Sequence, residues 1–123
     1  VMPIILQAPS GATWKEKLFD IANRRAQVFE TILPYRISAN LKRFQSPYLM
    51  QDYRRMLRLE GETVEAHLPP AVLNDVAAAR GLNVILSFQT WRLLRHDQDL
   101  PVDDAKAVVR RLLGDAMAGM PDK

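Results

Sequence analysis

Apolar residues recur every three or four positions along most of this chain, which is the period of an amphipathic α-helix. No segment alternates apolar and polar residues as a half-buried strand does. Glycine is sparse, with 5 residues, and the prolines fall largely between the periodic segments. At 123 residues the chain has the length of one domain. The pattern therefore predicts an all-α fold, a bundle of about five helices in a single domain over residues 1–123.

The first half of the chain predicts two long helices joined by a short helical piece. The first begins near Ser10 to Thr13 and runs to Leu33, where Pro34 is expected to end or kink it. A short piece follows over Tyr35 to Phe44. The second helix begins at Ser46-Pro47, a cap followed by a proline suited to the first helical position, and runs to about His67. Its apolar side carries Leu49, Tyr53, Met56, Val64 and Leu68.

The second half predicts two further helices after the break at Leu68-Pro69-Pro70. One helix is expected from about Ala71 to Asp97, and its part from Leu82 to Leu94 is apolar nearly all round. Such a helix must be covered on every side. The last helix starts after Pro101 and carries a wide apolar stripe, which is broader than one neighbour requires. Both features predict a homodimer.

Composition narrows the class of protein. The net charge is +3, and the basic pairs are spread along the chain, which favours solvated or ion-paired surface over a nucleic-acid footprint. The absence of cysteine fits a reducing cytosol. No apolar run approaches the roughly 18 residues of a membrane span, and no basic segment precedes an apolar one at the start as in a signal peptide. We expect a cytoplasmic protein that does not bind a membrane.

Catalytic and DNA-reading motifs are weakly supported. His67 and His96 are the only histidines, without metal-ligand spacing, and no glycine-rich phosphate loop is present. We expect no catalytic residue, metal or cofactor, and an enzyme is the least favoured class. Residues 76–82 have the Ala-then-Gly spacing of a helix-turn-helix, but the residues after it are apolar, whereas a recognition helix offers polar side chains to bases.

Polar residues on the apolar faces are the most informative about binding. Arg25 lies within the stripe of the first helix, and Glu60 and His67 project from the apolar side of the second. A buried charge needs a partner. One interpretation is an Arg25–Glu60 ion pair between packed helices, or an Arg25 that reaches solvent. The other is an apolar pocket with a few polar groups. The candidate ligand-binding residues are Arg25, Phe29, Tyr53, Met56, Glu60 and His67.

Three segments of the chain resemble the effector-binding domain of TetR-type transcriptional regulators. Residues 28–36 read Val-Phe-Glu-Thr-Ile-Leu-Pro-Tyr-Arg, and residues 46–49 read Ser-Pro-Tyr-Leu. The most specific segment spans residues 87–105, with Ser87-Phe88, Trp91, Leu94-Arg95 and then Leu100-Pro101 before an acidic turn. The likeness covers most of the chain. One departure is Pro101, where a serine or threonine cap is usual in the family.

The resemblance implies a specific arrangement of partners. In this family the last two helices of each subunit form an intermolecular four-helix bundle. A small-molecule effector in the helical core shifts an attached helix-turn-helix domain and so alters its binding to operator DNA. The implied dimer-interface residues are Phe88, Trp91, Arg95, Val108, Leu112 and Ala116. The DNA-binding domain is expected upstream of Val1, so operator DNA is a partner only through that domain.

A second hypothesis is a homodimeric all-α interaction module that binds no ligand. Both hypotheses predict a homodimer, but only the regulator is expected to have a ligand-binding pocket. The resemblance identifies neither the effector nor the operator.

Overall fold

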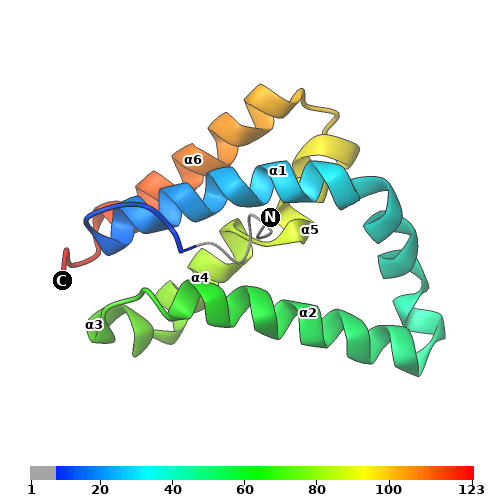
Figure 1. The fold of residues 1–123 in the computed structure, drawn as a ribbon, viewed down its shortest axis with the longest axis horizontal. Helices are drawn as coiled ribbons and strands as arrows, with labels where there is room; N and C mark the ends of the chain where they lie inside the picture. Colours follow the sequence, from blue (N-terminus) through cyan, green and yellow to red (C-terminus); the bar gives the residue numbers. More distant parts are fainter. Residues whose placement is uncertain (1–7) are drawn as a thin grey trace.

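Every regular element within residues 8–123, the range that the computed structural model describes, is a helix (Figure 1). The longer helices are α1 (Trp14–Leu41), α2 (Pro47–Glu65), α4 (Val76–Ile85) and α6 (Val102–Ala118). The shorter ones are the 3₁₀ helix η2 (Lys42–Gln45), α3 (Pro70–Leu73), α5 (Phe88–Arg92) and the π-helix η3 (Leu93–Asp97). The predicted all-α fold is confirmed. In residues 8–123 no helix has the length and apolar character needed to cross a membrane.

Helices α1 and α2 form the frame of the molecule. Thr13 caps α1 in a reciprocal arrangement, because its hydroxyl accepts from the Glu16 amide and the Glu16 carboxylate accepts from the Thr13 amide. Ser46 caps α2 by accepting from the Leu49 amide at 3.3 Å, and Pro47 takes the first helical position as predicted. Figure 1 shows that the chain turns through η2 at the end of α1, and that α2 then runs back alongside it.

The prediction that the first helix ends at Leu33 was wrong. Helix α1 continues through Pro34 to Leu41, so most of the separate piece expected over Tyr35 to Phe44 belongs to α1. A proline inside a helix removes one main-chain hydrogen bond. Here side chains on both sides of it hold the helix, since Phe29 is buried before it and Ile37 packs against the same cluster after it. Tertiary contacts outweigh the local preference.

The single helix expected over residues 71–97 is divided into α3, α4, α5 and η3. Two capping side chains account for the breaks. Asp75 accepts from the Ala78 amide and starts α4, and Ser87 accepts from the Thr90 amide and starts α5. The break at Ser87 also divides the apolar residues of this segment. Leu82 and Leu86 pack with one group of core residues and Phe88, Trp91 and Leu94 with another, whereas Val84 and Leu93 are exposed.

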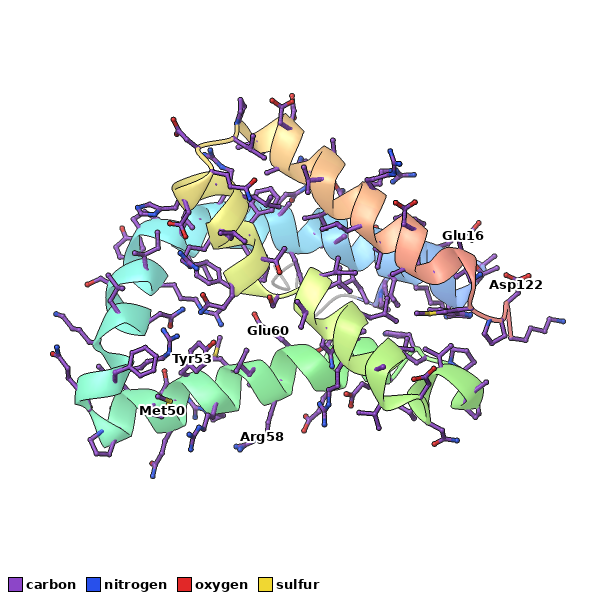
Figure 2. The ribbon with its side chains drawn as sticks, turned by 180° about the vertical axis from the view of Figure 1, so that it is seen from behind. Glu16, Met50, Tyr53, Arg58, Glu60 and Asp122 are labelled. Atoms are coloured by element: carbon purple, nitrogen blue, oxygen red, sulfur yellow. The ribbon has the colours of Figure 1, made fainter. Side chains whose placement is uncertain are left out.

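The last helix begins after Pro101, carries Asp103 and Asp104 in its first turn and is followed by Gly119, as predicted. Its end lies beside the start of α1, where the Trp14 indole donates to the Pro121 carbonyl at 3.1 Å and Lys15 pairs with Asp122 at 3.0 Å. In Figure 2 the labelled Glu16 and Asp122 accordingly lie at the same end of the bundle.

The core consists of two clusters of buried residues on either side of the α4–α5 break. The first lies between α1, α2, α3, α4 and α6, and comprises Trp14, Leu18, Ile21, Val64, Leu68, Val72, Ala79, Leu82, Leu86, Leu113 and Met117. The second lies between α1, α5, η3 and α6, and comprises Ala26, Phe29, Phe88, Trp91, Leu94, Ala105 and Val109. Helix α2 contributes a single fully buried residue, Val64, so most of its length lies beside the core and not within it.

A buried arginine joins the two clusters. Arg25 of α1 donates from Nη1 to the Leu86 carbonyl at 2.9 Å and from Nη2 to the Glu60 carbonyl at 2.8 Å. Burial lowers the pKa of Arg25, and the nearby Glu60 carboxylate opposes that shift. The arginine stays charged in proteins, so both carbonyls receive charge-assisted hydrogen bonds. Arg25 therefore ties α1 to the second half of α2 and to Leu86, the residue that caps the end of α4.

We predict that Arg25→Met lowers the free energy of unfolding by about 3 kcal/mol, because two charge-assisted bonds to buried carbonyls are lost. Urea unfolding followed by circular dichroism measures this change. Arg111→Met is the matched control, since Arg111 is exposed and pairs with Asp115 at 2.9 Å on the surface of α6. It is expected to lower the free energy by less than about 0.5 kcal/mol. Equal effects of the two substitutions would contradict the role given to Arg25.

Candidate ligand-binding groove

An open groove of about 670 Å³ separates α2 from the segment formed by α4, α5 and η3. Figure 2 shows the labelled Tyr53 and Glu60 on the side of α2 that faces α5. Apolar surface comes from Tyr53 and Leu57 on α2, from Val84 on α4 and from Leu93 on η3. The remaining lining is polar and comprises Arg58, Glu60, Gly61, Glu62, Glu65, Arg80, Asn83, Ser87, Gln89, Thr90 and Arg92. Its size lies within the roughly 300–1,000 Å³ typical of small-molecule sites.

An ion pair between α1 and α2 involves Glu60, one of the groove residues. Arg36 Nη1 contacts Glu60 Oε1 at 3.2 Å, and both side chains are largely buried. The Arg36 guanidinium also lies 4.4 Å from the centre of the Phe88 ring, a cation–π contact. Phe88 meets Phe29 edge to face, with ring centres 5.3 Å apart. Because α1 continues through Pro34, Arg36 extends the line of Arg25 and reaches the carboxylate of Glu60.

The expected Arg25–Glu60 ion pair is thereby corrected. Arg25 contacts Glu60 through the main-chain carbonyl, and the Glu60 carboxylate bonds to Arg36 instead. The guanidinium of Arg25 also lies too deep for the groove. With Phe29 it borders a separate void of about 10 Å³, which is no larger than the space needed for one water molecule.

The other candidate ligand-binding residues are distributed unevenly. Tyr53 and Glu60 line the groove. Phe29 is a core residue, as Arg25 is. Met56 is half-buried on α2 and His67 is half-buried beyond the end of that helix, and neither lines the groove. The structure thus brings two of the six predicted residues together at one surface.

Sequence reasoning missed the wall opposite α2. Asn83 donates from Nδ2 to Glu65 Oε1 at 3.2 Å, so α4 meets α2 across the groove. Gln89 Oε1 accepts from Arg92 Nε at 3.1 Å, within α5. The signal for this wall was Ser87, a residue suited to capping, since the helix that starts there brings Gln89, Thr90 and Arg92 to the groove.

The six predicted dimer-interface residues fall into two groups. Phe88 and Trp91 are buried in the core of their own chain, so their side chains are not presented to a partner in this conformation. Val108, Leu112 and Ala116 lie one turn apart on α6, where Leu112 is 44% exposed and the half-buried Val108 and Ala116 also pack against the core of their own chain. Arg95 is half-buried in the centre of η3.

Arg95 and Trp91 both bond to the Glu30 carboxylate of α1, and this cluster, here called the Glu30 clamp, holds the α5–η3 wall of the groove to α1. The Arg95 guanidinium makes two bonds to the Glu30 carboxylate, Nε to Oε2 at 2.9 Å and Nη2 to Oε1 at 2.8 Å. The Trp91 indole donates to the same carboxylate at 2.8 Å, and Arg95 Nη1 donates to the Leu100 carbonyl at 2.7 Å. The hydrogen bond from Arg95 lowers the pKa of Glu30, and the Trp91 indole adds to that shift. The clamp fixes α5 and η3 relative to α1.

Neither a metal-binding cluster nor a similarity to known proteins indicates what the groove binds. Within residues 8–123 no cluster of three histidine, aspartate or glutamate side chains is placed to hold a metal ion. The chain matches no protein-family model, no curated protein and no solved structure. What the groove does must therefore be argued from its own residues.

We predict that Glu30→Gln removes part of the acid sensitivity of the fold. The folded-state pKa of Glu30 is lowered, so its carboxylate stabilises the fold fully above its ordinary pKa of 4.5, and this contribution is lost as pH falls through the lower folded value. Stability of the unchanged protein should therefore drop more steeply below about pH 4.5 than that of Glu30→Gln.

Urea midpoints measured across a pH series test this. Asp115→Asn, which removes an exposed carboxylate on α6, is the control and should keep the steep drop. Parallel curves for the unchanged protein and Glu30→Gln would show that the clamp contributes nothing to acid sensitivity.

Proposed function

We propose that this chain is the effector-binding and dimerisation domain of a transcriptional regulator of the TetR type, with a small-molecule effector in the groove between α2 and α4–η3. The observation that carries the proposal is the groove itself, about 670 Å³ in volume with apolar surface from both walls. Its lining combines an apolar body with polar groups, which suits an organic molecule of moderate size.

The position of the groove supports a link between ligand and dimer. Helices α5 and η3 form one wall, and both pack against α6 and α1 through the second core cluster. On α6 the exposed Leu112 is flanked one turn away by the half-buried Val108 and Ala116, and we propose that this face meets a second copy. A ligand that prefers one spacing between α2 and α5 would then shift the population of dimer geometries, and with it the separation of attached DNA-binding domains.

We expect Val84→Trp to fill the groove and weaken binding of an apolar fluorescent probe, Nile red, by at least about tenfold. Val84 is 63% exposed and lines the groove. Val76→Trp is the matched control, because Val76 lies on the same helix, is 70% exposed and is outside the groove. Titration of both variants with Nile red measures the difference. Unchanged affinity in Val84→Trp would remove the groove as the ligand site.

We expect Leu112→Glu to convert a dimer to a monomer, because a carboxylate would be buried without a partner between the two α6 helices. Sedimentation velocity measures the mass. The control is Leu59→Glu on α2, a leucine that is 53% exposed and far from α6 in sequence. A dimer that persists in Leu112→Glu would exclude this face of α6. A dimer that binds no probe would instead favour a ligand-free interaction module.

A further inference from the structure

Positive charge is concentrated where α1 turns into α2. Residues 41–58, here called the basic turn, contain five of the 17 basic residues and one of the 14 acidic ones, a net charge of +4 in a chain whose net charge is +3. The rest of the chain is therefore net negative. Figure 1 places the basic turn, which includes η2 and the first half of α2, at one end of the molecule.

The fold brings together two basic pairs that are separate in the sequence, Lys42-Arg43 and Arg54-Arg55. The Arg43 guanidinium on η2 lies 4.3 Å from the centre of the Phe44 ring and 4.4 Å from the centre of the Tyr53 ring on α2. Arg43 therefore contacts the residue next to Arg54. In the sequence these pairs appear merely spread along the chain, whereas clustering of basic residues is what distinguishes a nucleic-acid footprint.

Three arginines of α2 border one open depression of about 500 Å³, which is lined by Tyr48, Gln51, Asp52, Arg54, Arg55 and Arg58. Asp52 pairs with Arg55 at 2.7 Å. No ion pair within residues 8–123 involves Arg54 or Arg58, although Arg58 also borders the groove that Glu62 lines. Figure 2 shows the labelled Arg58 projecting from α2 away from the bundle. Two exposed guanidinium groups are thus left to meet an anion.

Exposed aromatic rings accompany these arginines. Tyr48, in the first turn of α2, borders the depression and is 74% exposed, and Phe44 on η2 is 73% exposed. At 1.5 Å per residue, Tyr48 and Arg58 are about 15 Å apart along the axis of α2. A chain of phosphates that follows α2 would therefore meet a ring at one end of the depression and guanidinium groups at the other.

We propose that the basic turn binds single-stranded nucleic acid, with phosphates held by Arg54 and Arg58 and an unpaired base stacked on Tyr48. Guanidinium groups match the geometry of phosphate oxygens, and aromatic side chains stack on bases of any sequence. A duplex keeps the faces of its bases internal, so it would leave the exposed ring without a partner. This inference goes beyond the function proposed above and depends neither on the groove nor on the dimer.

The distribution of side chains on α2 favours this occupant over a bilayer. A helix that binds a membrane surface turns a separate apolar face to the lipid. The apolar side of α2 is already in use, because Tyr53 and Leu57 line the groove and Val64 belongs to the core. The side that borders the depression carries arginines, a glutamine, an aspartate and a single ring.

Fluorescence anisotropy with a labelled oligothymidine of about ten nucleotides tests the proposal. We expect binding at low salt that weakens as salt is added. Each phosphate that is neutralised contributes about −0.7 to the slope of log affinity against log salt, so two arginines predict a slope of about −1.4. Arg54→Gln should reduce its magnitude by about 0.7. Arg111→Gln, which removes an exposed charge on α6 outside the basic turn, is the control and should leave the slope unchanged.

Two variants of Tyr48 separate base stacking from apolar contact. Tyr48→Leu keeps an apolar side chain but removes the ring, so the affinity for oligothymidine should fall about tenfold. Tyr48→Phe keeps the ring and should keep the affinity. Binding of a duplex of the same length, which depends on charge alone, should be the same in both variants.

The proposal is overturned if oligothymidine does not bind at low salt, or if Tyr48→Leu binds it as tightly as Tyr48→Phe does. Tighter binding to vesicles that contain phosphatidylserine, retained in Tyr48→Leu, would identify a membrane surface instead. Competition by polyglutamate at the same concentration of charge as oligothymidine would identify an acidic protein segment. Either of these results would also overturn the proposal.

Discussion

The buried guanidinium of Arg25 is the constraint on which the arrangement of the helices depends. A charge in the interior must be met by acceptors, and here both acceptors are main-chain carbonyls, from Glu60 in α2 and from Leu86 at the end of α4. The Leu86 carbonyl that Arg25 meets stands at the point where α4 ends. Ser87 then starts α5 in a new direction, and the groove lies between that new direction and α2.

The sequence predicted helix boundaries correctly where a capping residue, proline or glycine marks the boundary by itself. Ser46-Pro47 at the start of α2, Pro101 before α6 and Gly119 after it are all found where expected. Boundaries that depend on competition between local and tertiary preferences were predicted wrongly. Pro34 lies inside α1 because packing on both sides holds the helix. The segment after Pro70 reads as continuous because its apolar period survives the breaks, and only the capping side chains of Asp75 and Ser87 reveal them.

The same error limited what could be said of the candidate site. Tyr53 and Glu60 were identified because they stand out as polar groups on the apolar side of one helix, and both line the groove. Arg25 stood out for the same reason but is a structural residue. Asn83 and Gln89 were not predicted as site residues, since on the single unbroken helix that we expected they are ordinary polar surface positions. The dimer interface stays a prediction, with the outer side of α6 as its remaining surface and with Phe88 and Trp91 inside the core.

Helix α2 has one fully buried residue, Val64, near its end, and this has a consequence for how the groove responds to a ligand. Local opening costs least where few apolar contacts must be broken. The part of α2 before Leu59 therefore has little protection against transient fraying, whereas α1 is anchored in the core from Trp14 to Phe29 and α6 from Ala105 to Met117. A molecule bound between α2 and α5 would restrict that fraying. Ligand binding would then be coupled to the rest of the domain through a loss of conformational entropy in α2, without a change in mean structure.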